Sequence, residues 1–184
     1  MPGPVEILMH EHRIIERALR ALRGVCQRFE NGEAVPPDAP TRLVEFIQTF
    51  ADRCHHGKEE KHLFPALEER GVPREGGPIG VMLYEHEVGR GFVREMVEAA
   101  SAYARGESAA AARFVSAARQ YMDLLAQHIH KEDNVLFQIA QSVLDAPTRA
   151  ALAEAFEREE AALGLGTHEQ YEALASELER AWAT

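Results

Sequence analysis

The sequence predicts an all-α protein, an up-down-up-down four-helix bundle followed by two short helices. Apolar residues recur at helical spacing in four long segments, and proline and glycine separate these segments from one another. The connections left between them are short, and long helices joined in this way pack as antiparallel neighbours. We therefore expect residues 1–145 to form the bundle and residues 146–184 to form a helical extension packed on it.

Turn-forming residues delimit the first two helices. The first helix is expected over about residues 5–31, where an Asn-Gly pair ends it. The second is expected over about residues 41–70, with Thr41 as its capping residue. Because Pro65 lies near the end of this helix, its last turns are expected to be kinked or frayed.

The later helices are bounded in the same way. The third is expected to begin at Pro78, a residue favoured in first turns, and to end at Arg105. The fourth is expected to run from a cap at Ser108 to about Val143. A Thr-x-x-Gln capping box is expected to open the last of the short helices. The two short helices are expected over residues 147–162 and 168–182.

Composition narrows the possible classes of function. The formal net charge is −10, which disfavours binding to nucleic acid or to anionic lipid. No apolar stretch approaches the roughly 20 residues that a membrane helix needs. Cys26 and Cys54 match no zinc-binding spacing and are expected to be reduced thiols, which suits a cytoplasmic protein. The unusual feature is the presence of nine histidines.

These histidines belong to an internal repeat. The pattern H-x-x-K-E-[ED]-x-x-L-F occurs at residues 55–64 and again at residues 128–137. A Glu-His pair precedes each copy, and its histidine lies 43 positions before the first copy and 42 before the second. The two halves are therefore interpreted as two copies of one helical hairpin.

The spacing within the repeat indicates a metal site. Helical residues four positions apart share a face, so each copy presents one imidazole and one carboxylate in the same direction. In an antiparallel bundle, the starts of the first and third helices lie beside the ends of the second and fourth. Buried groups of this kind need a bound cation, and the set suits two octahedral ions sharing carboxylates, with iron favoured. The expected ligands are His12, His55, Glu59, His86, His128 and Glu132.

The two repeat copies and the Glu-His pairs resemble the hemerythrin-like family, the HHE cation-binding domains, over about residues 5–143. The resemblance implies an oxo- or hydroxo-bridged pair of iron ions, held by the six expected ligands, with Glu59 and Glu132 as bridges. Oxygen carriers of the family use a fifth histidine from the third helix. Here Met82 and Arg90 stand one turn from His86, so an extra water or another group is expected at one iron.

Alternatives remain for the carboxylate and histidine ligands. His56 and Glu60 form a competing pair four residues apart, but the second copy has Ile129 in place of the histidine. Asp133 competes with Glu132 as the carboxylate of the fourth helix.

Three further histidines are expected to lie outside the metal layer. His10 and His130 are each two residues from an expected ligand and point to the opposite side of their helices. His168 has no partner in the sequence and is expected at the surface.

The expected function is that of a di-iron protein that binds or senses a small oxidant, namely dioxygen, nitric oxide or peroxide. One alternative is a di-iron enzyme that degrades peroxide or repairs iron-sulfur centres. Another is a structural or regulatory module that holds zinc or another divalent metal. The sequence does not identify a protein partner.

Overall fold

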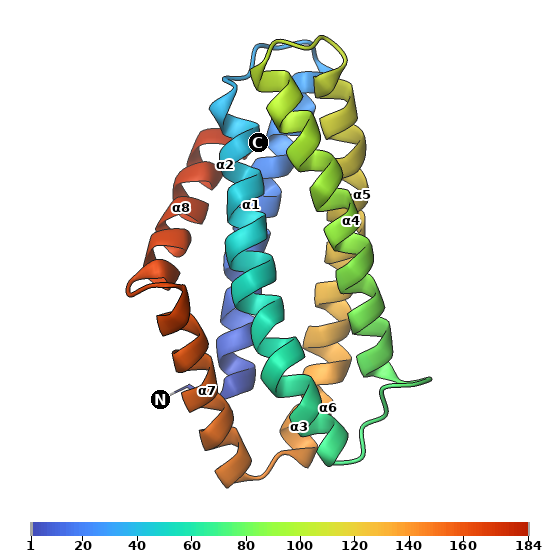
Figure 1. Cartoon of the computed structure of the whole chain (residues 1–184), viewed down its shortest axis with the longest axis vertical. Coiled ribbons are helices and arrows are strands. Elements are labelled where there is room, and N and C mark those ends of the chain that lie inside the picture. The colour runs from blue at the N-terminus through green and yellow to red at the C-terminus, as the bar shows by residue number, and fades with distance from the viewer. Residues whose placement is uncertain (1, 184) are drawn as a thin grey trace.

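The computed structural model describes residues 2–183 and confirms the all-α prediction, with no strand among the described residues (Figure 1). The bundle consists of four antiparallel helical stretches, which are called columns. The first column is a single helix, and the second is a continuous run of α- and π-helical segments. The third column is again one helix, and the fourth combines three segments. In chain order the segments are α1 (Pro4–Glu30), α2 (Asp38–Phe46), η1 (Ile47–His56), η2 (Glu59–Leu63), α3 (Phe64–Glu69), α4 (Pro78–Ala104), α5 (Ala110–Lys131), η3 (Glu132–Leu136) and α6 (Phe137–Val143).

Two more helices lie along one side of the bundle (Figure 1). These are α7 (Ala146–Leu163) and α8 (Thr167–Trp182). Helix α8 packs along α1 and touches α2, while α7 contacts α1, η1 and η2. The extension therefore packs mainly on the first and second columns, and α7 also reaches α6 of the fourth through a hydrogen bond from Arg149 to the carbonyl of Gln141.

The interior is divided into three parts. One apolar cluster fills the half of the bundle where α2 lies and includes Phe46, Phe50 and Phe114. A second fills the end near α3 and α6 and includes Phe64 and Phe137. Between them lies a buried polar layer, made of Glu11, His12, His55, His56, Lys58, Glu59, His86, His128 and Glu132.

The π-helical segments differ from the regular α-helices that the spacing predicts. They occur in the second and fourth columns, at the level of the polar layer. Such segments have wider turns with hydrogen bonds from residue i to residue i+5, and they are frequent at functional sites. Pro65 has no backbone N–H to donate within a helix. Helix α3 nevertheless follows η2 directly, so the last turns of the second column do not fray.

Three expected capping interactions are absent. The second column starts at Asp38, which leaves Thr41 inside the helix. Ala109 rather than Ser108 is the N-cap of α5, and no side chain caps it. Thr167 lies within α8 and donates its hydroxyl to the carbonyl of Leu163, so it is not the cap of a capping box.

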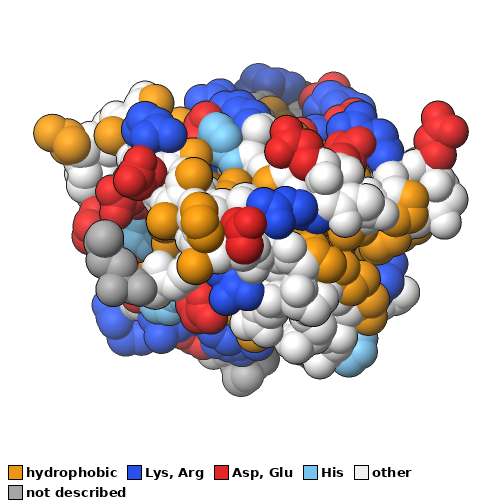
Figure 2. All heavy atoms as spheres, turned by 90° about the horizontal axis from the view of Figure 1, so that it is seen from below, with side chains coloured by type: hydrophobic (Ala, Val, Ile, Leu, Met, Phe, Trp, Pro, Cys, Tyr) orange, Lys and Arg blue, Asp and Glu red, His pale blue; other side chains and the backbone are white. Residues whose placement is uncertain are grey.

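The surface of the molecule mixes both signs of charge. Figure 2 shows the end of the bundle where α1 begins, and acidic, basic and hydrophobic side chains intermingle there. Among residues 2–183, no helix is both long enough and apolar enough to cross a bilayer.

The packing of α8 on α1 depends on a close approach at Gly24. A Cβ at this position would collide with the carbonyl oxygen of Trp182 near the end of α8. We predict that Gly24→Ala lowers the free energy of unfolding by about 1–3 kcal/mol, because backbone has to move to relieve the overlap. Trp182 is the single tryptophan, so its fluorescence during urea unfolding reports directly on this contact.

The matched control is Gly91→Ala in α4. Its added Cβ would meet only the end of the Arg94 side chain, at 3.8 Å. Removing a glycine from a helix interior there should raise stability by about 0.5–1 kcal/mol. Equal effects of the two substitutions would contradict the close approach.

Candidate metal centre

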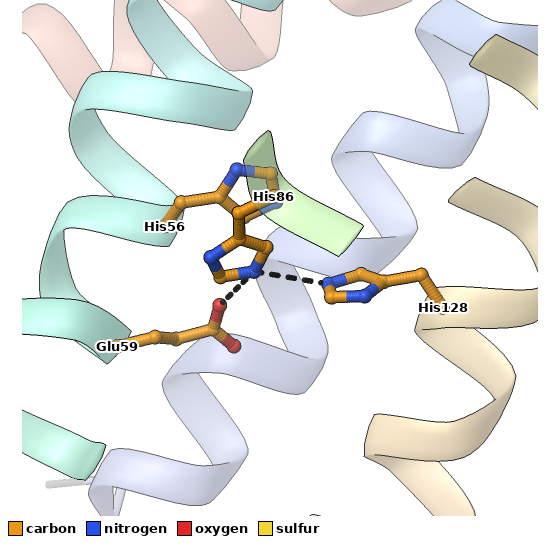
Figure 3. Close-up of side chains that lie close together, drawn as sticks. All are labelled: His56, Glu59, His86 and His128. Carbon is orange, nitrogen blue, oxygen red and sulfur yellow. Dashed lines mark hydrogen bonds and ion pairs between the residues drawn. The ribbon is translucent and has the colours of Figure 1, made fainter. Parts of the chain in front are cut away.

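The structure brings all six expected ligands together in the polar layer, in two overlapping groups. Within each group, one donor atom from every residue lies within 4.8 Å of the others. All the side chains involved are buried. The first group contains His12, His55, Glu59 and Glu132, and the second contains His56, Glu59, His86 and His128 (Figure 3).

Two carboxylates link the groups. Glu59 belongs to both, with Oε1 3.5 Å from Nε2 of His55 and Oε2 3.5 Å from Nε2 of His86. Glu132 places Oε2 3.1 Å from Nε2 of His12 and 3.3 Å from Nε2 of His128. Each carboxylate thus lies between imidazoles of different groups, which is the position a bridging ligand requires.

His56 is a member of the layer that the sequence interpretation did not include among the ligands. Its side chain is 7% exposed, and its ring stacks on His86 with 3.8 Å between ring centroids (Figure 3). Adjacent residues of an α-helix point about 100° apart, whereas η1 turns both His55 and His56 toward the interior. The structure therefore places His56, which the sequence left as an alternative, among the donor atoms of the layer.

The outer nitrogen of four histidines meets a carboxylate. This arrangement fixes the orientation of each ring and turns Nε2 toward the centre, as in the carboxylate-histidine-metal pattern. The Nδ1 to oxygen distances are 2.7 Å for His12 and Asp133, 2.8 Å for His55 and Glu11, 2.7 Å for His86 and Glu60, and 2.8 Å for His128 and Glu85.

The acidic residues that competed as ligands in the sequence, Asp133 and Glu60, belong to neither donor group. Asp133 contacts His12 Nδ1 and Arg13, and it does not enter either group. Arg90 binds Asp52 and Glu60, so it supports the layer from outside.

Each outer carboxylate is in turn paired with a cation. The lysines of the two repeat copies bind the glutamates of the two Glu-His pairs, and arginines bind the other two carboxylates. Although both copies of the repeat contain the lysine, the sequence interpretation assigned it no role. The pairs are Glu11 with Lys58, Glu85 with Lys131, Asp133 with Arg13, and Glu60 with Arg90.

Of the three histidines expected outside the metal layer, two lie where they were expected. His10 and His130 are exposed, as expected. His168 is not a partnerless surface residue, because its side chain is only 17% exposed and Nδ1 lies 3.7 Å from Glu11 and 3.6 Å from Glu160. The difference arises because its neighbours come from α1 and α7, far away in the sequence.

The inner layer is electrostatically unbalanced without a cation. Burial and the nearby charge of Glu132 raise the pKa of Glu59 well above its usual range. Burial alone would also raise the pKa of Glu132, but His128 and His12 hold it well below that range. Burial and the charge of His12 lower the pKa of His55 to about 4. Two neighbouring buried carboxylates repel each other when both are ionised. Ionisation of both Glu59 and Glu132 is therefore unfavourable unless a cation lies beside them.

The unpartnered buried atoms of the layer are the kind of atoms that a metal ion would bind. Several buried donor atoms have no hydrogen-bond partner in the described part of the chain, namely Nε2 of His55, both oxygens of Glu59 and Oε1 of Glu132. Buried polar atoms are normally satisfied, and the residues that carry these four atoms all belong to the two donor groups. Divalent cations would satisfy them, so the residues present fit a metal pair.

A small cavity adjoins the second group. It has a volume of about 20 Å³, which suits one or two small molecules the size of water. Its walls include His56, His86 and His128, together with apolar Val93 and Leu125. The cavity is therefore mostly apolar and opens onto the imidazoles of one group only.

Fold and site together define a metal-binding four-helix bundle. A family model, that of the hemerythrin HHE cation binding domain, matches residues 3–140, and the chain belongs to this family.

The chain is also similar to several curated proteins. The chain is 35% identical over 136 residues to the iron-sulfur cluster repair protein DnrN of Neisseria gonorrhoeae, covering 71% of this chain and 85% of that protein. It is 26% identical over 138 residues to the iron-sulfur cluster repair protein YtfE of Dickeya chrysanthemi, covering 72% and 62%. It is 28% identical over 155 residues to the uncharacterized protein Rv1995 of Mycobacterium tuberculosis, covering 84% and 60%. The chain thus spans about 60% of the length of this mycobacterial relative. No solved structure matches the chain.

The two lysines of the repeat provide a matched pair for mutation. Lys58 is fully buried between Glu11 and Glu160, whereas the side chain of Lys131 is 39% exposed. We predict that Lys58→Met costs about 3–5 kcal/mol of stability because it leaves a buried carboxylate unpaired. Lys131→Met should cost about 1 kcal/mol or less. Urea unfolding of the two metal-free variants measures both, and a similar cost for each would refute the role assigned to burial.

The layer also predicts how pH acts on the metal-free protein. Burial alone would lower the pKa of His128, but Glu132 and Glu85 raise it from 6.5 to about 9. The stability that this proton contributes is complete below pH 6.5 and is lost as pH rises through about 9. Glu59, with its raised pKa, acts in the same direction. Bound metal replaces these protons, so the melting temperature of the metal-free protein should fall across this range more than that of the loaded protein. A parallel pH dependence of both forms would contradict this assignment.

Proposed function

We propose that this chain holds two iron ions in the polar layer and uses them to bind or sense a small oxidant. The observation that carries the proposal is the pair of overlapping donor groups that share Glu59, because one ion in each group would be joined by a common carboxylate. The proposed ligands are His12, His55, Glu59, His86, His128 and Glu132, with Glu59 and Glu132 as bridges.

We further propose His56 as a seventh ligand. It supplies the fifth imidazole of the layer from the second column, whereas the third column offers only Met82 and Arg90 near His86. With His56 the second group has three imidazoles and the first has two. The two ions would therefore differ in their surroundings.

The donor set and the cavity support an oxidant as the ligand. An iron pair supplies reversible one-electron redox chemistry and Lewis acidity toward dioxygen, nitric oxide or peroxide. Imidazoles outnumber carboxylates here, whereas ferritin-like di-iron proteins use more carboxylates. The cavity beside His86 has room for a molecule of two heavy atoms, and Tyr121 and Leu125 shield it from bulk water.

A second candidate is a role in iron-sulfur cluster repair. It is favoured by the names of the Neisseria and Dickeya relatives, of which the first is covered over most of its length. The same metal pair would serve this function, so the candidates differ in what the iron acts on.

We propose a cytoplasmic location for this activity. Cys26 and Cys54 are free and buried, and burial raises the pKa of each thiol to about 12. Such thiols are unreactive, and free cysteines suit a reducing compartment.

Metal analysis of protein produced with iron available tests the proposal. We expect about two irons per chain, and we expect His55→Ala and His128→Ala to lower both the iron content and the melting temperature. His130→Ala removes an exposed histidine of the same helix as His128 and should change neither. Zinc in place of iron, or full iron content in both ligand variants, would overturn the proposal.

Rapid mixing of the reduced protein separates the candidate functions. A stable and reversible spectral change with dioxygen or nitric oxide supports binding or sensing. Loss of peroxide over many turnovers supports an enzyme. Recovery of a damaged iron-sulfur protein only in the presence of the iron-loaded chain supports repair.

A further inference from the structure

A second cluster of metal-binding side chains lies on the seam between α1 and α8. His168 and Glu172 are four residues apart on α8, so they share a face, and His10 faces them from α1. One donor atom from each of the three lies within 4.8 Å of the others. The His10 Nε2 to Glu172 Oε1 distance is 3.7 Å, and the two imidazole rings are nearly parallel at an interplanar angle of 19°.

The surroundings of His168 distinguish this cluster from a chance surface grouping. Its Nδ1 is buried and has no hydrogen-bond partner in the described part of the chain. The same nitrogen faces the carboxylates of Glu11 and Glu160 at 3.7 and 3.6 Å. A carboxylate behind one ring nitrogen is the arrangement that supports metal binding at the other, and the four inner histidines have it in a tighter form.

Charge and space at the seam also suit a cation. A cavity of about 530 Å³ adjoins the cluster and is lined in part by Glu6, Glu157 and Glu160. These carboxylates give the cavity a negative potential, and its volume leaves room for water or another ligand on a bound ion. His10, whose side chain is 57% exposed, can adjust its rotamer without disturbing the core.

We propose that His10, His168 and Glu172 form a second, peripheral site for a divalent transition-metal ion of the zinc type. Tetrahedral zinc holds nitrogen and oxygen ligands roughly 3.4 Å apart, so the observed 3.7 Å between His10 and Glu172 needs only a small closure. Two histidines and one carboxylate leave the fourth position for water from the adjoining cavity. The site joins α8 to α1, so an ion bound there fastens the extension to the bundle.

The peripheral site is also connected to the inner layer. His168 faces Glu11, and Glu11 binds Nδ1 of the inner ligand candidate His55 at 2.8 Å. The imidazole of His168 and the carboxylate of Glu11 therefore lie between an ion at the seam and His55 of the first donor group. This chain of contacts lies on the side of the first donor group.

Titration of protein whose inner site is already loaded tests the proposal. The metal content is measured first, and Zn²⁺ is then added in a calorimeter, with Co²⁺ as a spectroscopic probe of tetrahedral coordination. We expect one further equivalent of Zn²⁺ to bind and to raise the melting temperature. His10→Ala and Glu172→Gln should each weaken this binding by about tenfold or more while the previously loaded metal stays in place.

His130→Ala is the matched control, since it removes an exposed histidine from α5, away from the seam. It should leave the additional equivalent unchanged. Both test substitutions alter partly exposed side chains, so the variants should fold, and Trp182 fluorescence verifies that α8 stays docked. Absence of the additional equivalent, or equal Zn²⁺ affinity in wild type and both test variants, would overturn the peripheral site. Because the inner metal is counted separately, neither result bears on the identity of the iron pair.

Discussion

The burial of Glu59 and Glu132 side by side is the constraint on which the rest of the structure depends. Neither has a lysine or arginine as its immediate partner among the described residues, and their neighbours are imidazoles. Burying two carboxylates in this way is costly unless cations join them. The surrounding shells alternate in charge: outer carboxylates hold the imidazoles, and lysines or arginines hold the outer carboxylates. A bound metal would thus complete a charge pattern that the side chains alone leave unbalanced.

This layer separates the hydrophobic core into two clusters, so the bundle has no continuous apolar interior. Helix packing on either side of the layer holds the four columns at fixed positions, and this preorganises the donor atoms. The cost of keeping metal-free ligands close together is therefore met by apolar packing above and below them. Metal binding and folding are coupled through the same residues, which is why stability and metal occupancy should change together.

The sequence predicted the columns and six inner residues because both follow from local spacing. Apolar periodicity defines the helices, and positions four apart, such as His55 and Glu59, share a face in either copy of the repeat. His56 could not be predicted in the same way, since its inward direction depends on the π-helical turns of η1. The sequence shows that Lys58 recurs in both copies of the repeat, but it does not show that Lys58 binds Glu11. The two residues are 47 positions apart in the chain, so local spacing does not reveal their contact. Similarly, His168 acquires its neighbours only when α8 packs on α1.

The two halves of the repeat become unequal once the extension covers one of them. Within each hairpin the contacts correspond, with Glu11 on His55 in the first half and Glu85 on His128 in the second. In the first half Glu160 of α7 also binds Lys58, whose side chain is fully buried, whereas the side chain of the corresponding Lys131 is 39% exposed. The second group instead adjoins the small apolar cavity. The imidazoles of the two donor groups therefore differ in their surroundings, because those of the second group line a cavity and those of the first do not line it.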